Sequence, residues 1–215
     1  MPRSDLRTLL ATSPVVPVLV IDSVETALPL ARALVAGGLP LLEITLRTDA
    51  ALDVIEAIAG EVEGAVVGAG TVLTPEQLDA VARRGARFAV SPGATEALLD
   101  AAQASAVPLL PGAATASEVM RLLECGYREM KFFPAEPAGG IAYLKALASP
   151  LPEACFCPTG GIDAARAKAY LALSNVACVG GSWVAPADAV RAGDWARITA
   201  LAKDAAALRR ARAEA

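Results

Sequence analysis

The chain has 215 residues, of which 55% are hydrophobic, and its formal net charge is −4. A chain of this size and composition can bury one sizeable core, so we expect a single domain over residues 1–215. The acidic balance gives no basic field for nucleic acid, and no basic stripe interleaved with aromatic residues occurs. We therefore expect no nucleic-acid partner.

The early apolar run at residues 14–21 is too short to span a bilayer, and no small-residue cleavage site follows it. We expect a cytosolic protein with no membrane interaction. Cys125, Cys155, Cys157 and Cys178 have neither zinc-site spacing nor a disulfide framework, so we predict reduced, buried thiols.

Histidine is absent from the sequence. Its absence removes the commonest general base and the commonest ligand of transition metals. Any chemistry must therefore use Lys, Glu, Asp, Arg, Thr or Tyr, and we expect a reaction without a metal or another cofactor.

Short apolar, β-branched runs alternate with Ala- and Leu-rich helical patterns along the whole chain. The predicted strands are Val15–Val20, Leu41–Leu46, Ala65–Gly68, Phe88–Ser91, Pro108–Leu110, Glu129–Phe133, Cys155–Cys157 and Val176–Val179. The predicted helices are Ser23–Ala36, Ala50–Ile58, Pro75–Arg84, Glu96–Ala104, Ser117–Cys125, Ile141–Ala148, Ala164–Leu173 and Trp195–Ala211.

Several of these helices carry end signals. Thr74 stands before Pro75, and Thr115 stands before Glu118 at capping spacing, whereas glycines follow three helices at Gly37, Gly85 and Gly126. Eight strands, each followed by a helix, predict an α/β fold of the (β/α)8 (TIM) barrel type. The alternative is a doubly wound open sheet, which usually shows a Gly-rich dinucleotide motif after its first strand; none is present.

The second predicted strand carries a carboxylate and a guanidinium on one face. The period of two places Leu41, Glu43, Thr45 and Arg47 on the same side. If this face is the barrel interior, burial is costly unless a charged substrate compensates. A structural ion pair is the alternative.

Lys131 is the only one of four lysines that falls in a predicted strand. Its neighbours are Met130 and Phe132, so desolvation disfavours the ammonium form and makes the amine available to attack a carbonyl. The alternatives are a lysine that reaches solvent or one that neutralises a buried acid.

Glycine-rich turns follow several strands. The turns at residues 68–71 and 91–95 decide nothing alone, because turn chemistry also explains glycine and proline. Glycine pairs 160–161 and 180–181 follow the last two strands, where barrel enzymes bind phosphate through backbone amides. The two pairs favour an anion site there.

Eight segments together resemble the 2-keto-3-deoxy-6-phosphogluconate (KDPG) aldolases, also called KDPG/KHG aldolases. They are PVVPVLV, LLEITLRT, VVGAGTVL, AVSPGAT, LLPGAAT, KFFPAE, FCPTGGI and VGGSWVAP, in the expected order from residue 14 to about residue 186. The resemblance implies a homotrimeric barrel lyase that cleaves KDPG to pyruvate and glyceraldehyde 3-phosphate, as in the Entner–Doudoroff route. Many relatives also cleave 4-hydroxy-2-oxoglutarate.

The resemblance also implies residue roles. Lys131 would form the Schiff base, Glu43 would shuttle protons, and Arg47 would bind the substrate carboxylate with help from Thr71. The other implied binding residues are Thr159 at the pyruvate end, Pro92 and Phe133 in the lining, and Gly160, Gly161, Gly181 and Ser182 at the phosphate.

Two departures from the family pattern, Ala113-Ala114 and Pro137-Ala138, lie in loops that could tune the aldehyde acceptor. Three other hypotheses stay open. A phosphosugar isomerase or phosphate-site synthase would give Lys131 no covalent role, and a binding protein would hold an anion without turnover. Within the aldolases, a galactonate-derived substrate is the nearest rival.

Overall fold

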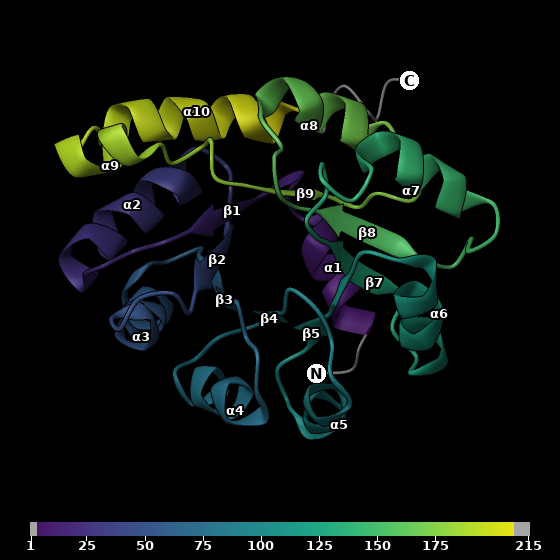
Figure 1. Cartoon of the computed structure of the whole chain (residues 1–215). Helices are drawn as coiled ribbons and strands as arrows, with labels where there is room; N and C mark the ends of the chain where they lie inside the picture. Colours follow the sequence, from purple (N-terminus) through teal and green to yellow (C-terminus); the bar gives the residue numbers. More distant parts are fainter. Residues whose placement is uncertain (1–3, 209–215) are drawn as a thin grey trace.

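The computed structural model describes residues 4–208 as a curled parallel sheet surrounded by helices (Figure 1). The strands are β1 Val15–Leu19, β2 Leu41–Thr45, β3 Val66–Gly70, β4 Ala89–Val90, β5 Leu109–Leu110, β6 Gly112–Ala113, β7 Glu129–Phe132, β8 Cys155–Pro158 and β9 Val179–Gly181. The helices are α1 Ser4–Ala11, α2 Val24–Ala36, α3 Ala51–Glu61, α4 Pro75–Arg83, α5 Glu96–Ala104, α6 Ala116–Glu124, α7 Gly140–Ala148, α8 Ala164–Leu171, α9 Ala187–Ala192 and α10 Trp195–Ala207.

All strand pairs are parallel. Six strands form one sheet in the order β5-β4-β3-β2-β1-β9, and three form another in the order β6-β7-β8. Two isolated bridges, Phe156 to Val176 and Thr159 to Gly180, connect the β8 segment to the β9 segment. The carboxyl ends of the strands therefore lie on one side of the molecule.

Strands β5 and β6 are two halves of one extended segment. Leu109 and Leu110 pair with β4, whereas Gly112 and Ala113 pair with β7. Pro111 lies between them; it has no N–H to donate, but its carbonyl oxygen accepts from the N–H of Lys131 at 2.9 Å. One segment thus connects the two sheets.

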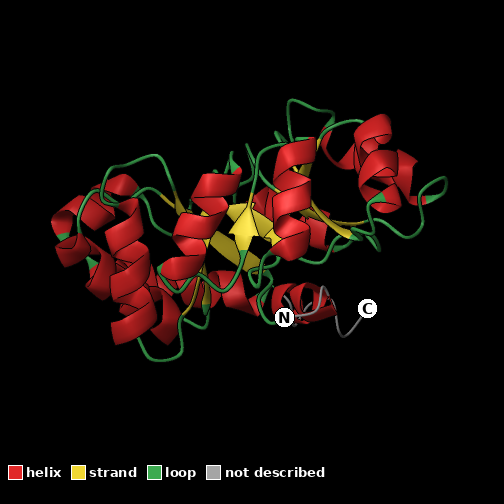
Figure 2. Cartoon of the chain, turned by 90° about the horizontal axis from the view of Figure 1, so that it is seen from below, coloured by secondary structure: helices red, strands yellow, loops and turns green. Residues whose placement is uncertain are grey.

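Side chains divide between two buried clusters according to the face of their strand. Leu42 and Ile44 belong to the large cluster between strands and outer helices, whereas Leu41 belongs to a smaller cluster inside the curl. Leu6 and Leu10 of α1 pack into this inner cluster, so α1 covers the amino ends of the strands. Figure 2 shows the helices around the central strands from another side.

The predicted alternation of strands and helices is confirmed, with an α/β class and a parallel, curled sheet. Thr74 and Thr115 cap their helices as predicted, Thr115 in a reciprocal capping box with Glu118. Gly85 and Gly126 adopt left-handed backbone just past the ends of α4 and α6.

The prediction missed helices α1 and α9. The first precedes the first strand, outside the strand–helix alternation on which the prediction rested, and the second has only six residues, too few to give a clear helical period. The final helix was predicted over Trp195–Ala211, but α10 ends at Ala207, and residues 209–211 lie outside the described part. Within residues 4–208, no helix combines the length and apolar character needed to cross a bilayer.

Packing of α10 on α2 depends on the absence of a side chain at Gly37. A Cβ there would lie 2.3 Å from the Cβ of Ala202 and 2.8 Å from the carbonyl oxygen of Thr199. We predict that Gly37→Ala lowers the free energy of unfolding by about 1–3 kcal/mol because the helices must separate. Denaturant unfolding measures this change.

Gly60 provides the matched control. It lies within α3, and a Cβ there would meet nothing within 4 Å. Gly60→Ala should raise the free energy of unfolding by about 0.5–1 kcal/mol, because alanine favours the helix. Equal effects of the two substitutions would contradict the steric explanation.

Candidate active site

One face of β2 supplies polar side chains to the interior of the curl. Leu41 at its start lies in the inner cluster, and Glu43 and Thr45 on the same face are 3% and 2% exposed. The Thr45 hydroxyl donates to the carbonyl oxygen of Leu19 at 2.9 Å and accepts from Nε of Arg47 at 3.1 Å. The predicted common face of Leu41, Glu43 and Thr45 is confirmed.

Lys131 and Glu43 meet inside the curl. The Lys131 Nζ donates to the Glu43 Oε1 at 3.0 Å, and the two side chains are only 8% and 4% exposed. Glu43 lies on β2 and Lys131 on β7, so the pair connects the two sheets. The two residues that the resemblance identifies as catalytic are therefore in direct contact.

Burial of this pair costs free energy for both charges. Each ion loses hydration on burial, and removal of either partner leaves an uncompensated charge. The ring of Phe133 adds a cation–π contact, with its centroid 5.4 Å from Nζ. A primary amine is thus held beside a carboxylate, where a proton can pass between them over a short distance.

Gly70 provides the space for the Glu43 carboxylate. A Cβ at Gly70 would lie 2.3 Å from Glu43 Oε1. The sequence interpretation treated the glycines at 68–71 as turn residues and missed this role. The signal was available, because Gly68 and Gly70 share a strand face by the period of two, and Gly68 similarly admits the Phe88 ring.

Thr159 lies at the end of β8 and is 7% exposed. Its hydroxyl lies where a Cβ on Gly180 would come within 2.2 Å, so glycine at that position makes room for it. Cys157, two residues earlier, aligns with Lys131 in the β7–β8 register. Thr159 therefore lies one side-chain layer nearer the carboxyl ends than Lys131.

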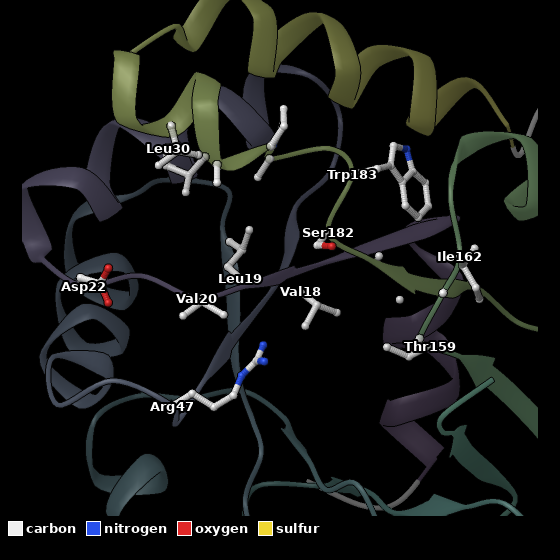
Figure 3. Close-up of a pocket in the computed structure, with 18 of the residues that line it drawn as sticks. Val18, Leu19, Val20, Asp22, Leu30, Arg47, Thr159, Ile162, Ser182 and Trp183 are labelled. Carbon is white, nitrogen blue, oxygen red and sulfur yellow. The ribbon is translucent and has the colours of Figure 1, made fainter. Parts of the chain in front are cut away.

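A cavity of about 730 Å³ opens at the carboxyl ends of β1, β2, β8 and β9 (Figure 3). In Figure 3 the guanidinium of Arg47 points into the cavity from one side, and Thr159 and Ser182 lie on the other. Its lining includes six predicted site residues: Arg47, Thr159, Gly160, Gly161, Gly181 and Ser182.

The other five predicted residues do not line this cavity. Glu43 lies on β2, four residues before the lining residue Arg47. Lys131 aligns with Cys157, two residues before the lining residue Thr159, so Glu43 and Lys131 both lie deeper along the strands. Phe133 contacts Lys131 from the end of β7.

Thr71 and Pro92 follow β3 and β4. Thr71 has a φ of 60°, left-handed backbone that non-glycine residues rarely adopt outside turns and functional sites. A Cβ on Gly112 would lie 2.2 Å from the carbonyl carbon and oxygen of Pro92, so the segment after β4 packs closely on strand β6.

The glycines of the predicted phosphate site have different local causes. Gly160 and Gly161 have φ values of 106° and 78°, which favour glycine. At Gly181, a Cβ would lie 1.8 Å from Cζ3 of Trp183, so the indole ring accounts for glycine there. Glycine at 181 is thus no evidence for phosphate, although its backbone lines the cavity.

Sequence reasoning missed several lining residues. Val20 and Asp22 come from the segment after β1, whereas Val190 and Arg191 come from α9. Arg191 adds a second cation to the lining besides Arg47. Val190 and Arg191 could not be identified from strand ends, because α9 itself was not predicted. Val20 and Asp22 lie at and just after the end of the predicted first strand, so their position was a signal that the sequence interpretation did not use.

The site combines a buried amine, an adjacent carboxylate, a guanidinium in the cavity and glycine-rich loops. An amine so placed can add to a carbonyl, and the carboxylate can accept and return protons during the reaction. Fold and site together are those of a Schiff-base-forming enzyme that acts on an anionic carbonyl compound.

The comparisons with known proteins agree with this class. The family model described as KDPG and KHG aldolase matches residues 6–201, and the chain belongs to this family. It is 57% identical over 194 residues to the 2-dehydro-3-deoxy-phosphogluconate aldolase of Pseudoalteromonas atlantica, covering 90% of each chain.

Two solved structures are similar throughout. A KDPG aldolase from Legionella pneumophila, with pyruvate captured as a covalent carbinolamine intermediate, has a TM-score of 0.91 and 50% identity, covering 93% of this chain and 97% of that one. The enzyme of Zymomonas mobilis with 3-phosphoglycerate has a TM-score of 0.92 and 50% identity, covering 98% and 99%.

The burial of the Glu43–Lys131 pair predicts a large cost for breaking it on one side. Glu43→Leu leaves a buried ammonium without its carboxylate and should lower the free energy of unfolding by about 3 kcal/mol. The double variant Glu43→Leu, Lys131→Met should fall within about 1 kcal/mol of the wild type or exceed it. Denaturant unfolding at neutral pH measures both; equal losses in the two variants would contradict the interpretation.

Proposed function

We propose that the chain is a class I aldolase that cleaves KDPG to pyruvate and glyceraldehyde 3-phosphate. It also cleaves 4-hydroxy-2-oxoglutarate to pyruvate and glyoxylate. The observation that carries the proposal is the buried contact of the Lys131 amine with the Glu43 carboxylate, at 3.0 Å. Family membership and the carbinolamine observed in the Legionella relative support it.

In the proposed mechanism, Lys131 adds to C2 of the oxo acid, water leaves, and the iminium forms. Glu43, directly or through a water molecule, takes the proton of the C4 hydroxyl. The electrons of the C3–C4 bond move to C3, so an aldehyde departs and an enamine remains. Proton return to C3 and hydrolysis of the iminium release pyruvate and restore the amine.

Binding residues divide between the two ends of the substrate. Arg47 holds the carboxylate by paired hydrogen bonds and turns C2 toward Lys131, with Thr71 and Thr159 beside it. Phe133 and Pro92 line the reacting centre. At the other end Gly160, Gly161, Gly181 and Ser182 receive the phosphate, largely through backbone amides.

The rival functions use fewer of these features. An isomerase or synthase would use the glycine-rich loops but would give Lys131 no covalent role. A binding protein would gain nothing from a desolvated amine. A galactonate-derived substrate needs the same chemistry, so the gluconate assignment rests on relatives named for phosphogluconate, such as that of Pseudoalteromonas atlantica.

The proposal includes finer features of the protein. The bridges between β8 and β9, with the continuous segment through Pro111, support a closed (β/α)8 barrel as a single domain over residues 1–215. We propose a homotrimer on the basis of the family resemblance. The cytosolic location and the absence of a metal or other cofactor remain predictions from the sequence.

Borohydride reduction in the presence of pyruvate tests the covalent step. We predict a pyruvate-derived adduct on Lys131, located by peptide mass mapping, and its absence in Lys131→Ala. Lys145→Ala is the control, because that lysine lies on the outer helix α7 and its loss should not change trapping. No adduct from folded wild-type protein at several pH values would refute the aldolase mechanism.

Arg47→Ala tests the proposed carboxylate contact. Loss of charge-assisted hydrogen bonds to the substrate should raise KM for KDPG roughly 10- to 100-fold. Arg47→Lys should give an intermediate KM because it keeps the charge but not the paired geometry. Arg121→Ala removes an exposed arginine on α6 and should change neither KM nor kcat. Steady-state kinetics measures all three variants.

A further inference from the structure

Glu136 joins the segment after the Lys131 strand to the glycine loop after β8. Its backbone N–H donates to the carbonyl oxygen of Gly160 at 3.1 Å, and the N–H of Ala135 donates to that of Thr159 at 2.8 Å. The loops that follow β7 and β8 are therefore hydrogen-bonded to each other at the mouth of the site.

The Glu136 side chain turns toward α8. The hydroxyl of Tyr170, a residue with 0% exposure, donates to Glu136 Oε1. Burial, followed by the contact with Glu136, raises the pKa of Tyr170, so the hydroxyl stays a neutral donor across physiological pH. One side of the carboxylate is thus fixed by a donor that cannot move without unpacking α8.

Arg166 holds the other carboxylate oxygen. Its Nε lies 3.3 Å from Glu136 Oε2, and its Nη1 lies 2.7 Å from Asp163 Oδ2 and 3.4 Å from the carbonyl oxygen of Gly161. The same guanidinium therefore contacts Glu136, the start of α8 and the glycine loop. Asp163 in turn caps α8 by accepting from the N–H of Arg166.

Glycines leave room for this arrangement. A Cβ on Gly161 would lie 2.8 Å from Glu136 Cγ, and a Cβ on Gly140 would lie 3.1 Å from the Tyr170 hydroxyl. Gly161 therefore lines the cavity on one side and packs on the Glu136 side chain on the other.

Electrostatics makes a carboxylate at this place unexpected. A negative charge behind an anion-binding loop opposes the anion unless it is neutralised nearby. Arg166 supplies that neutralisation, and Glu136 is not among the residues that line the cavity. Glu136 can therefore affect ligand binding only by holding the loop backbone in place, not by contact with a ligand.

We propose that Glu136, held by Tyr170 and Arg166, is a positioning residue that fixes the Gly160–Gly161 amides at the distance from Lys131 that a phosphorylated substrate requires. The inference rests on the proposed function and deepens it, since it assigns phosphate discrimination to a cluster outside the cavity. The unphosphorylated substrate 4-hydroxy-2-oxoglutarate gains less from this arrangement, because its chain ends in a carboxylate at C5 and carries no C6 phosphate.

Tyr170→Phe tests this role with almost no change in packing. We expect KM for KDPG to rise about five- to tenfold and kcat to change less than twofold. The KM for 4-hydroxy-2-oxoglutarate should stay within about twofold, because its cleavage needs only the Lys131 end. Inorganic phosphate, titrated calorimetrically, should bind about fivefold more weakly than to wild type.

Two further variants and a control keep the test decisive. Arg166→Ala removes an exposed side chain, so folding should persist even if the buried Tyr170→Phe change proves disruptive, and the same split between substrates is expected. Glu136→Gln retains an acceptor for Tyr170 but not the charge, and should give a smaller shift than Arg166→Ala. Glu56→Gln, which removes a similar arginine-paired carboxylate on α3, should change neither substrate's constants.

Equal loss for both substrates, or unchanged phosphate affinity in Tyr170→Phe and Arg166→Ala, would overturn the proposal and leave the cluster a purely structural role. Pyruvate trapping on Lys131 reports separately on the proposed function. If wild-type protein fails to trap pyruvate while the variants bind phosphate more weakly, the aldolase function is rejected but the positioning role is not. If wild-type protein traps pyruvate while the variants bind phosphate as tightly as wild type, only the positioning role is rejected.

Discussion

The arrangement of the interior depends on one buried ion pair, because each of its charges would be costly to bury alone. Lys131 and Glu43 are 8% and 4% exposed and lie 3.0 Å apart, so each makes the burial of the other tolerable. Toward the amino ends of the strands the interior is apolar, with Leu41 and the α1 leucines. Toward the carboxyl ends it becomes polar, at Thr45 and Thr159. The pair therefore marks the boundary between a region that only packs and one that can bind a substrate.

Glycines around the site mostly make room for neighbouring groups. Gly70 admits the carboxylate of Glu43, Gly180 admits the hydroxyl of Thr159, and Gly161 admits the side chain of Glu136. Each would place a Cβ within 2.8 Å of that neighbour, closer than side-chain carbons pack. Functional geometry here is set as much by missing side chains as by present ones.

Much of the fold could be predicted because strand periodicity carries the information, whereas the roles of Lys131 and Glu43 came from the family resemblance. The period of two assigned Leu41, Glu43 and Thr45 to one face, and that face points inward, since Leu41 joins the inner cluster and Glu43 contacts Lys131. Helix α1 was missed because it precedes the first strand and lies outside the strand–helix alternation, and α9 was missed because six residues give little periodic signal. Arg191 was missed with α9, since only the tertiary arrangement brings it to the cavity, whereas Asp22 lies just after β1 and could have been considered from its position.

Closure of the amino ends of the strands by α1 has a consequence for the order of events. Leu6 and Leu10 fill that end, so a substrate can approach the buried Lys131 amine only from the carboxyl ends, where the cavity lies and from whose lining Lys131 is set back. In the proposed reaction, the fragment that carries the phosphate lies in the cavity at the carboxyl ends of the strands, and the fragment bound to Lys131 lies deeper in the protein. The aldehyde must then depart before pyruvate, and the last-released product is the one that the enzyme holds covalently.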